Sequence, residues 1–210
     1  MGGLRSLLAL GEAFQTIRRG SAEAMLAGAT GSRLHPMKAV HSRQQEELAD
    51  GDTEPARASR PFDPNRTGMV LGEGAGAVVL EEKSHAEARG VTIYGEVLSA
   101  ATSSACDRNR VAHRDRAIQE VFGRRSRPVP VTAAKSYFGN LGAGSGMIET
   151  ACALLSWTHD RLFPILNYQT PDPDCPIAAV TDPDTLPGDS FLRVNVTPQG
   201  QAAVVLVRRV

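Results

Sequence analysis

The pattern of hydrophobic positions at the start of the chain predicts a helix and then a strand. Apolar residues recur at helical spacing at Leu7, Leu10, Phe14 and Ile17. Gly20 follows them and is a typical helix stop signal. Residues 23–30 (EAMLAGAT) are short and apolar, which predicts a buried strand. Residues 32–60 are polar and lack periodicity, which predicts a loop with at most one exposed helical turn.

The middle of the chain alternates between strand and helix patterns. Residues 74–82 (GAGAVVLEE) predict a strand entered through glycines, and residues 84–90 (SHAEARG) predict a short helix ending at glycine. Residues 91–104 (VTIYGEVLSAATSS) are β-branched and predict a strand with a bend at Gly95. Residues 114–123 (RDRAIQEVFG) predict a helix.

The last third continues this alternation. Residues 129–134 (VPVTAA) predict a buried strand, and a helix is expected from 145 to 157 after a glycine-dense turn. Residues 191–210 predict two strands around the turn TPQGQ, and the Pro/Asp-rich segments 170–176 and 181–189 predict surface loops. Alternating strands and helices place the chain in the α/β class.

Composition narrows the classes of function. The 210 residues carry no formal net charge, which argues against a nucleic-acid-binding protein. No apolar run approaches the roughly 20 residues that span a bilayer, so no membrane segment is expected. The three cysteines are odd in number and match no metal-binding spacing, which favours reduced thiols in a cytoplasm and no metal site.

The glycine-dense turn in KSYFGNLGAGSGMIE (135–149) is the strongest candidate for a functional site. Four glycines surround Asn140, and this density requires positive φ angles or close approach of backbones. The spacing fits neither a dinucleotide fingerprint, because Met147 replaces a needed glycine, nor a P-loop, because the Lys-Ser pair precedes the glycines. Two interpretations remain: tight packing of a helix on a sheet, or a ligand site at the end of a strand.

Several stretches together resemble the β-ketoacyl-[acyl-carrier-protein] synthase family, elongating type. They are RPFDPNRTGMVLGEGAGAVVLEE (60–82), the turn at 135–149, LNYQTPDPDC (166–175) and GEAFQTIRRGSAEAMLAGAT (11–30). The resemblance implies a thiolase-like fold of two related α/β halves, layered helix, sheet, helix, sheet, helix. It covers about half of a full-length member, with residues 1–90 as the end of the N-terminal half and residues 91–210 as a shortened C-terminal half.

The resemblance also implies a chemistry and its residues. In the family a cysteine takes an acyl chain as a thioester, malonyl-carrier loses carbon dioxide, and the resulting carbanion attacks that thioester in a decarboxylative Claisen condensation. Lys135 and Glu149 match the family lysine and glutamate, and Asn140 falls on the second family histidine. An amide N–H₂ group can donate a hydrogen bond to a thioester oxygen as an imidazole can. These three residues are the expected catalytic residues.

The same alignment shows what the sequence lacks. The family nucleophile should lie eight residues before Gly11, where the chain has Gly3, and the family His-Gly-Thr motif is absent. His113 is interpreted as a solvated loop histidine, and the alternative is that the stretch VAH, which ends at His113, is a remnant of that motif. None of the cysteines stands at the nucleophile position: Cys106 lies in the shortened connection, Cys152 is expected to face the core from a helix, and Cys175 lies in a Pro/Asp-rich loop.

Three functional hypotheses follow. The first is a synthase that condenses acyl and malonyl thioesters in fatty-acid or polyketide synthesis, although the chain alone is expected to be inactive. The second is a non-catalytic partner similar to a chain-length factor. The third is an inactive gene fragment, which open strand edges and an exposed apolar face would make prone to aggregation. The implied partners are acyl carrier protein and a second chain, in a homodimer or a heterodimer with a complete synthase, and no cofactor is implied.

Overall fold

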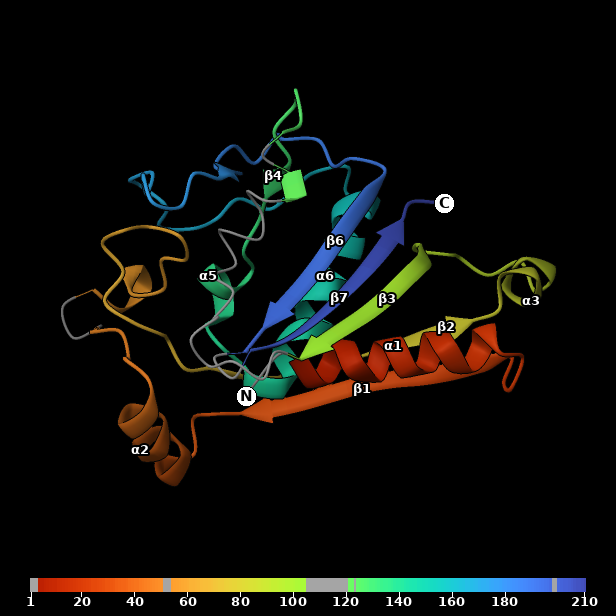
Figure 1. Cartoon of the computed structure of the whole chain (residues 1–210), viewed down its shortest axis with the longest axis horizontal. Coiled ribbons are helices and arrows are strands. Elements are labelled where there is room, and N and C mark those ends of the chain that lie inside the picture. Colours follow the sequence, from red (N-terminus) through yellow and green to blue (C-terminus); the bar gives the residue numbers. More distant parts are fainter. Residues whose placement is uncertain (1–3, 51–53, 105–120, 123, 198–199) are drawn as a thin grey trace.

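Two antiparallel sheets enclose a pair of helices in the computed structural model, which describes residues 4–50, 54–104, 121–122, 124–197 and 200–210 (Figure 1). Helix α1 spans Leu4–Arg18 and helix α6 spans Ser145–Thr158, and both contact strands of the two sheets. The described part of the chain therefore has a sheet, helix, sheet arrangement, three of the five layers expected for the fold. The predicted helices at 7–17 and 145–157 are confirmed.

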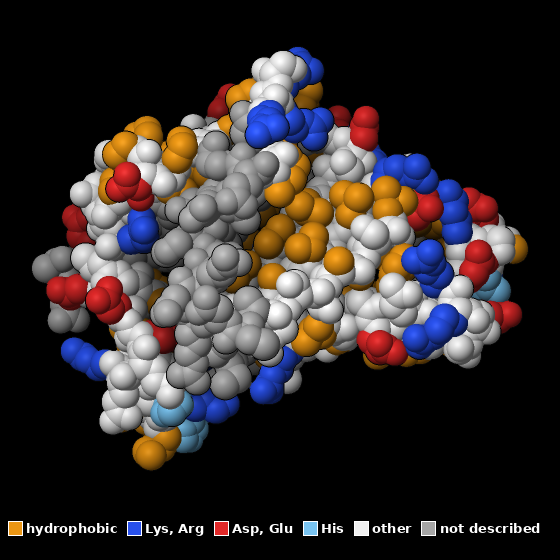
Figure 2. Space-filling model, viewed as in Figure 1, with side chains coloured by type: hydrophobic (Ala, Val, Ile, Leu, Met, Phe, Trp, Pro, Cys, Tyr) orange, Lys and Arg blue, Asp and Glu red, His pale blue; other side chains and the backbone are white. Residues whose placement is uncertain are grey.

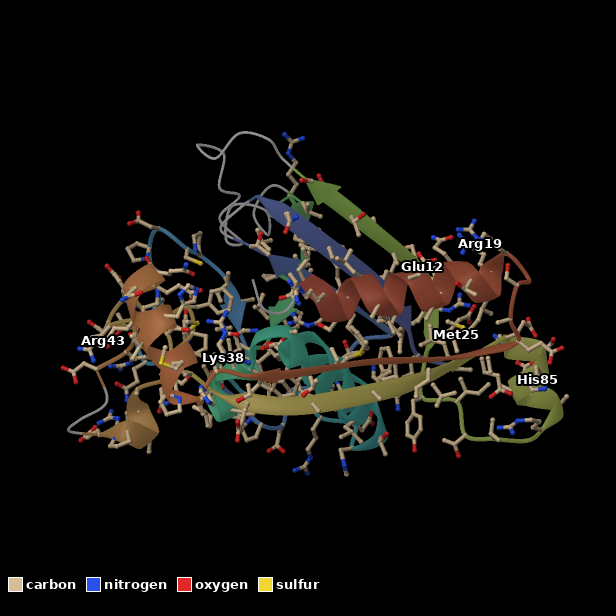
Figure 3. The ribbon with its side chains drawn as sticks, turned by 90° about the horizontal axis from the view of Figure 1, so that it is seen from below. Glu12, Arg19, Met25, Lys38, Arg43 and His85 are labelled. Atoms are coloured by element: carbon tan, nitrogen blue, oxygen red, sulfur yellow. The ribbon has the colours of Figure 1, made fainter. Side chains whose placement is uncertain are left out.

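The first sheet consists of β1 (Ala24–Ser32) and β2 (Glu73–Glu81), paired along their whole length. Ala27 faces α1 and is 3% exposed, whereas the paired residues Leu26 and Val79 on the other face are 72% and 70% exposed. In Figure 3 both strands lie on the near side of the molecule, and no described helix is drawn in front of them. The expectation of a buried strand at 23–30 is therefore correct for one face only.

The second sheet has the strand order β3–β7–β6, with all neighbours antiparallel. Strand β3 spans Glu96–Ser104, β6 spans Ser190–Val196 and β7 spans Gln201–Arg208. This confirms the two predicted C-terminal strands, while β3 begins later than predicted, after Gly95. Leu192 and Leu206 are paired on the outward face, where Figure 2 shows hydrophobic side chains gathered over this sheet.

The core lies between the two sheets. Its buried side chains come from α1, β1, α6 and β7: Leu4, Leu7, Leu10, Ala13, Ala27, Met147, Trp157, Ala203, Val205 and Val207. Complete burial of a side chain such as Leu7 or Met147 stabilises the fold by about 1.5–3 kcal/mol. The Trp157 ring packs 5.0 Å from the Phe191 ring, and its Nε1 donates a hydrogen bond to the Gly188 carbonyl at 2.7 Å. Helix α6 is thereby attached to strand β6.

A ten-residue helix, α2 (Pro36–Gln45), lies where the sequence predicts a loop. Proline is compatible with the first helical turn, and Ser42 is the one buried residue of this helix. Met37 and Val40 are 72% and 56% exposed, so the apolar positions do not mark a buried stripe. Figure 3 shows that α2, which carries the labelled Lys38 and Arg43, lies apart from α1. The prediction failed because the periodic spacing of apolar residues reveals only helices with a buried face, and α2 has a single buried residue.

The remaining elements are short. Helix α3 spans Lys83–Ala88 as predicted, and α5 spans Lys135–Phe138. The predicted strand at 129–134 is reduced to β4 (Pro130–Val131), which pairs in parallel with β5 (Ala178–Ala179). The 3-10 turns η1 and η2 span Pro55–Arg57 and Gly142–Gly144. The predicted helix at 114–123 lies outside the described residues except for 121–122.

The predicted Pro/Asp-rich surface loops at 170–176 and 181–189 contain no helix and no regular strand. Within the described ranges, no helix is both long enough and apolar enough to cross a membrane.

Candidate active site

The glycine-dense turn packs directly against the first sheet. A Cβ atom on Gly144 would lie 2.3 Å from the Gly74 carbonyl oxygen of β2 and 3.1 Å from the Gly31 nitrogen of β1. Real Cβ atoms do not approach that closely, so only glycine fits there. Gly139 has a φ of 70°, a conformation that glycine adopts without strain. Both predicted reasons for the glycines, close approach and positive φ, are confirmed, and the turn is fixed on the sheet.

The backbone of Asn140 is held as though it belonged to a strand. Its N–H donates to the Val70 carbonyl at 2.8 Å, and its carbonyl accepts from the Gly72 N–H at 3.1 Å. These bonds form a parallel bridge between Asn140 and Leu71, just before β2 begins. The position of the Asn140 side chain is therefore set by the first sheet as well as by the turn.

The side chain of Asn140 is oriented by its own turn. Its Oδ1 accepts hydrogen bonds from the Gly142 N–H at 3.0 Å and from the Ser145 Oγ at 3.4 Å. Ser145 is fully buried, and its Oγ in turn accepts from the Leu141 N–H at 3.0 Å. Because the oxygen end is used inside the turn, the N–H₂ end points away from the turn, and Nδ2 lies 2.7 Å from Met69 Sδ. The amide is thus held as a directed hydrogen-bond donor.

Lys135 and Glu149 form a buried ion pair, and a third residue joins them. Lys135 Nζ contacts Glu149 Oε1, and Arg193 Nη2 from β6 contacts Glu149 Oε2. The Glu149 side chain is 7% exposed, compared with 21% for Lys135 and 18% for Arg193. Two cations therefore contact the two oxygens of one buried carboxylate. These contacts connect α5, α6 and β6. We call these three residues the Glu149 triad.

The structure brings two of the three predicted site residues into direct contact. Lys135 and Glu149 pair, whereas the Asn140 side chain bonds to Gly142, Ser145 and Met69. Arg193 was missed from the sequence, although a signal was present. Arg193 alternates with Phe191 and Asn195 along β6, so its side chain lies on the same inward face of the strand. A cation at such a position needs a buried partner.

Asp63 supports the site from the neighbouring loop. Its carboxylate is fully buried and accepts hydrogen bonds from the backbone N–H groups of Asn65, Gln169 and Thr170 at 2.8–3.0 Å. Burial by itself raises the pKa of this carboxyl, but the three N–H groups and the charge of Arg60 outweigh it and lower the pKa to about 2. Asp63 therefore ties the two family-like stretches at 60–82 and 166–175 together.

The same loop holds the backbone of Lys135. Ser59 Oγ donates to the Lys135 carbonyl at 2.7 Å, and the Asn167 side-chain amide donates to the Ser59 carbonyl at 2.9 Å. The start of α5 is therefore fixed by two separate segments of the chain.

The Cys152 thiol does not have the character of an activated nucleophile. Cys152 is half-buried on α6, so the expectation that it faces the core is only partly correct, and burial raises the pKa of its thiol. Cys175 is buried. A raised pKa keeps a thiol protonated at neutral pH, whereas a nucleophile must be a thiolate. Gly3, Cys106 and His113 lie outside the described residues.

A cavity that is widely open to solvent lies beside the site. It has a volume of about 440 Å³ and is lined by Glu47, Pro64, Arg66, Gly68 and Met69. Met69 therefore borders this cavity and also contacts the Asn140 amide. Across the described ranges, no group of three or more His, Cys, Asp or Glu side chains is placed to hold a metal ion.

Comparison with known proteins connects this geometry to one family. Residues 6–86 match the family model described as beta-ketoacyl synthase, N-terminal domain, and residues 113–169 match its C-terminal domain. The chain is 30% identical to the 3-oxoacyl-[acyl-carrier-protein] synthase 2 of Synechocystis sp., over 87% of this chain and 52% of that protein. It is 31% identical to the tetracenomycin polyketide synthase ketoacyl synthase alpha subunit of Streptomyces glaucescens, over 80% of this chain and 49% of that one.

Solved structures give the same assignment. A type II polyketide ketosynthase, determined in complex with its acyl-carrier protein and bound to the hexaketide, superposes with a TM-score of 0.88 at 27% identity, covering 98% of this chain and 60% of that one. A beta-ketoacyl synthase from Burkholderia phymatum gives a TM-score of 0.86 at 25% identity, covering 98% and 59%. The chain spans about half the length of the curated relatives it matches. The resemblance seen in the sequence is confirmed, and the chain belongs to the β-ketoacyl synthase family, with the thiolase-like fold.

Proposed function

We propose that this chain provides the carbonyl-binding part of a β-ketoacyl synthase site, with Asn140 as the donor to a thioester oxygen. The orientation of its amide is the observation that supports this proposal. Gly142 and Ser145 hold the oxygen end, so the N–H₂ group is fixed in the orientation of a donor. Donors fixed in advance where negative charge develops contribute strongly to catalysis.

The step that this donor serves is the loss of carbon dioxide from a malonyl thioester. The bond between the carboxylate carbon and the methylene carbon breaks, and carbon dioxide leaves. The electron pair moves into the thioester, which becomes an enolate with its charge on the oxygen. A hydrogen bond from Asn140 Nδ2 stabilises that oxygen. In the absence of an acyl acceptor, the enolate carbon takes a proton from water, and the product is an acetyl thioester.

The Glu149 triad has a positioning role in this proposal. Lys135 lies at the start of α5, Glu149 in α6 and Arg193 in β6, so their contacts hold the two ends of the Asn140 turn in place. A misplacement of about 1 Å can cost on the order of 100-fold in rate. The Glu149 carboxylate offsets one of the two positive charges and holds both cations in place.

Complete condensation requires an acyl group on a thiolate, which the enolate would attack. Burial raises the pKa of the Cys152 thiol, so this thiol does not have that character. We therefore assign the decarboxylation of the malonyl thioester to this chain and place the acyl thioester on a partner. An acyl carrier protein and a second synthase chain, in a homodimer or heterodimer, fit this role, in a cytoplasm where thiols stay reduced. One solved relative is a ketosynthase complexed with its acyl-carrier protein.

The test is decarboxylation of malonyl-pantetheine by the full chain, followed by mass spectrometry of acetyl-pantetheine formation. We expect a rate above the uncatalysed reaction, and a loss of about 100- to 1,000-fold in catalysed rate with Asn140→Ala, the usual effect of removing one such donor. Asn140→His should retain activity because imidazole N–H also donates.

A matched control is Gly188→Ala, at a position where an added Cβ meets no atom within 4 Å. Each variant should give a cooperative urea transition, which separates loss of chemistry from loss of fold. Equal rates for Asn140→Ala and the unchanged chain would exclude the assigned role of this amide.

A further inference from the structure

The donor end of Asn140 is already occupied in the ligand-free chain. Met69 Sδ lies 2.7 Å from Asn140 Nδ2 and 3.7 Å from Nη1 of Arg33. Arg33 also pairs with Glu46, whose Oε2 is 3.3 Å from the same Nη1. The thioether sulfur is therefore the acceptor for an amide and faces a guanidinium. A thioether is a weak acceptor compared with a carbonyl oxygen, so this contact is one that a ligand can replace.

The backbone of Met69 is fixed by hydrogen bonds, whereas its side chain can adopt other rotamers. Its N–H donates to the Glu47 carbonyl at 2.8 Å, and its carbonyl accepts from the Ala49 N–H at 3.0 Å. The preceding Gly68 packs so closely that a Cβ there would lie 2.5 Å from the Leu48 carbonyl carbon. A methionine side chain has three rotatable bonds and adapts to irregular spaces. The cavity of about 440 Å³ that Met69 borders provides the space for a different rotamer.

We propose that Met69 is a gate residue: its sulfur holds the Asn140 amide in the empty site, and a thioester carbonyl displaces it into the adjoining cavity. This inference rests on the proposed function, because it names the group that a thioester must replace at Asn140. It adds a specificity-determining residue to the site. A ligand that offers an acceptor oxygen to Nδ2 opens the gate, whereas a ligand of the same shape without that oxygen does not.

The gate makes a prediction about affinity. Removing the sulfur with Met69→Ala takes away the competing acceptor, so a malonyl thioester should bind more tightly by about fivefold, the effect of one net hydrogen bond. Met69→Leu keeps the side-chain bulk without the sulfur, and it should also release the amide. Asn140→Ala removes the group for which sulfur and ligand compete, so adding Met69→Ala to it should give no gain in affinity.

The experiment is an NMR titration of the full chain carrying ¹³C-methyl methionine and ¹⁵N asparagine. The Met69 methyl signal, one of five, is identified by its loss in Met69→Leu. We expect the Met69 methyl and the Asn140 side-chain amide to shift together when malonyl-pantetheine is added. A pantetheine S-propyl thioether, which lacks the carbonyl, should shift neither.

Two outcomes separate the gate from the proposed function. If the Asn140 amide shifts with malonyl-pantetheine while the Met69 methyl stays still, the gate is wrong and carbonyl binding stands. If the thioester shifts neither signal, carbonyl binding at this site fails. The gate contact itself is then tested in the ligand-free chain, where Asn140→Ala must move the Met69 methyl signal. An unchanged methyl signal there would overturn the gate, provided that the rest of the spectrum shows the native fold.

Discussion

Arg193 contacts the Glu149 carboxylate from strand β6, on the oxygen opposite to the one that Lys135 contacts. The pairing links the second sheet to the helix that follows the Asn140 turn. Glu149 is the most buried of the three side chains, so its charge depends on these two partners. Because a buried charge without a partner is costly, each cation has a structural role that does not require contact with a ligand.

Glu149→Ala should lower the free energy of unfolding by about 3–5 kcal/mol, because it leaves two partly buried cations facing each other. The triple substitution of Lys135 and Arg193 to Met and Glu149 to Leu should recover most of that loss, since apolar side chains of similar size can replace a buried ionic cluster. Urea unfolding followed by the fluorescence of Trp157, the single tryptophan, measures both. A loss below about 1 kcal/mol for Glu149→Ala would contradict a buried triad.

Asp63 makes the stability of the chain depend on acid pH. The pKa of this carboxyl is about 2 in the folded chain and 3.8 as its ordinary value, so folding favours the ionised form. Its contribution of about 2 kcal/mol is fully present above pH 4 and is lost as the pH falls toward 2. Asp63→Asn should remove this contribution, because it removes the titrating carboxylate charge. Its single oxygen also cannot accept both from the Asn65 N–H, which bonds to Oδ1, and from the Gln169 and Thr170 N–H groups, which bond to Oδ2.

The measurement is the difference in unfolding free energy between the unchanged chain and Asp63→Asn across pH 2 to 7. Taking the difference cancels the titration of the other carboxyls. This difference in unfolding free energy should be largest near neutral pH and should decrease steadily below pH 4. A difference that stays constant down to pH 2 would show that the charge of Asp63 is not responsible.

The parts of the fold that the sequence predicted correctly are those with a buried face. Helices α1 and α6 and strands β2, β6 and β7 each place apolar residues at the period of their structure, because each packs on the core. Helix α2 has a single buried residue, Ser42, so burial left no periodic trace in its sequence. Strand β4 was overestimated because its run of small and β-branched residues continues beyond the two residues that find a partner in β5.

The candidate site was predicted through its motif, not through its contacts. The turn at 135–149 placed Lys135, Asn140 and Glu149, and the first and last of these do meet. Arg193 and Met69 reach the site from distant strands and loops, and their contacts follow from the tertiary fold alone. The sequence pattern near a residue does not indicate which distant residues it will contact in the fold. The exposure of Leu26 and Val79 was missed for a related reason, since a run of apolar residues does not say which face of a strand is covered.

Gly144→Ala should destabilise the chain by about 1–3 kcal/mol, as overpacking of a fixed backbone contact does. The added Cβ would lie 2.3 Å from the Gly74 carbonyl oxygen, and neither backbone can move without disturbing the pairing of β1 with β2. The matched control is again Gly188→Ala, which should change the unfolding free energy by less than about 0.5 kcal/mol. Similar values for the two variants in urea would show that the turn is not held tightly on the sheet.

The outward face of the first sheet should govern how readily the chain self-associates. Leu26 and Val79 are directly paired and are 72% and 70% exposed, so they form an apolar pair on a two-stranded sheet whose outer edges have no described partner. Exposed apolar strands of this kind template association. The double substitution Leu26→Thr and Val79→Thr places β-branched strand formers at both positions and removes apolar surface.

We expect this double variant to scatter less light than the unchanged chain at equal concentration and to unfold within about 1 kcal/mol of it, because little buried area is lost. Met37→Thr with Val40→Thr on α2 removes a comparable amount of exposed apolar surface away from any strand, and should leave association unchanged if the strand face is responsible. Equal light scattering from the strand variant and the unchanged chain would instead place the associating surface elsewhere on the molecule.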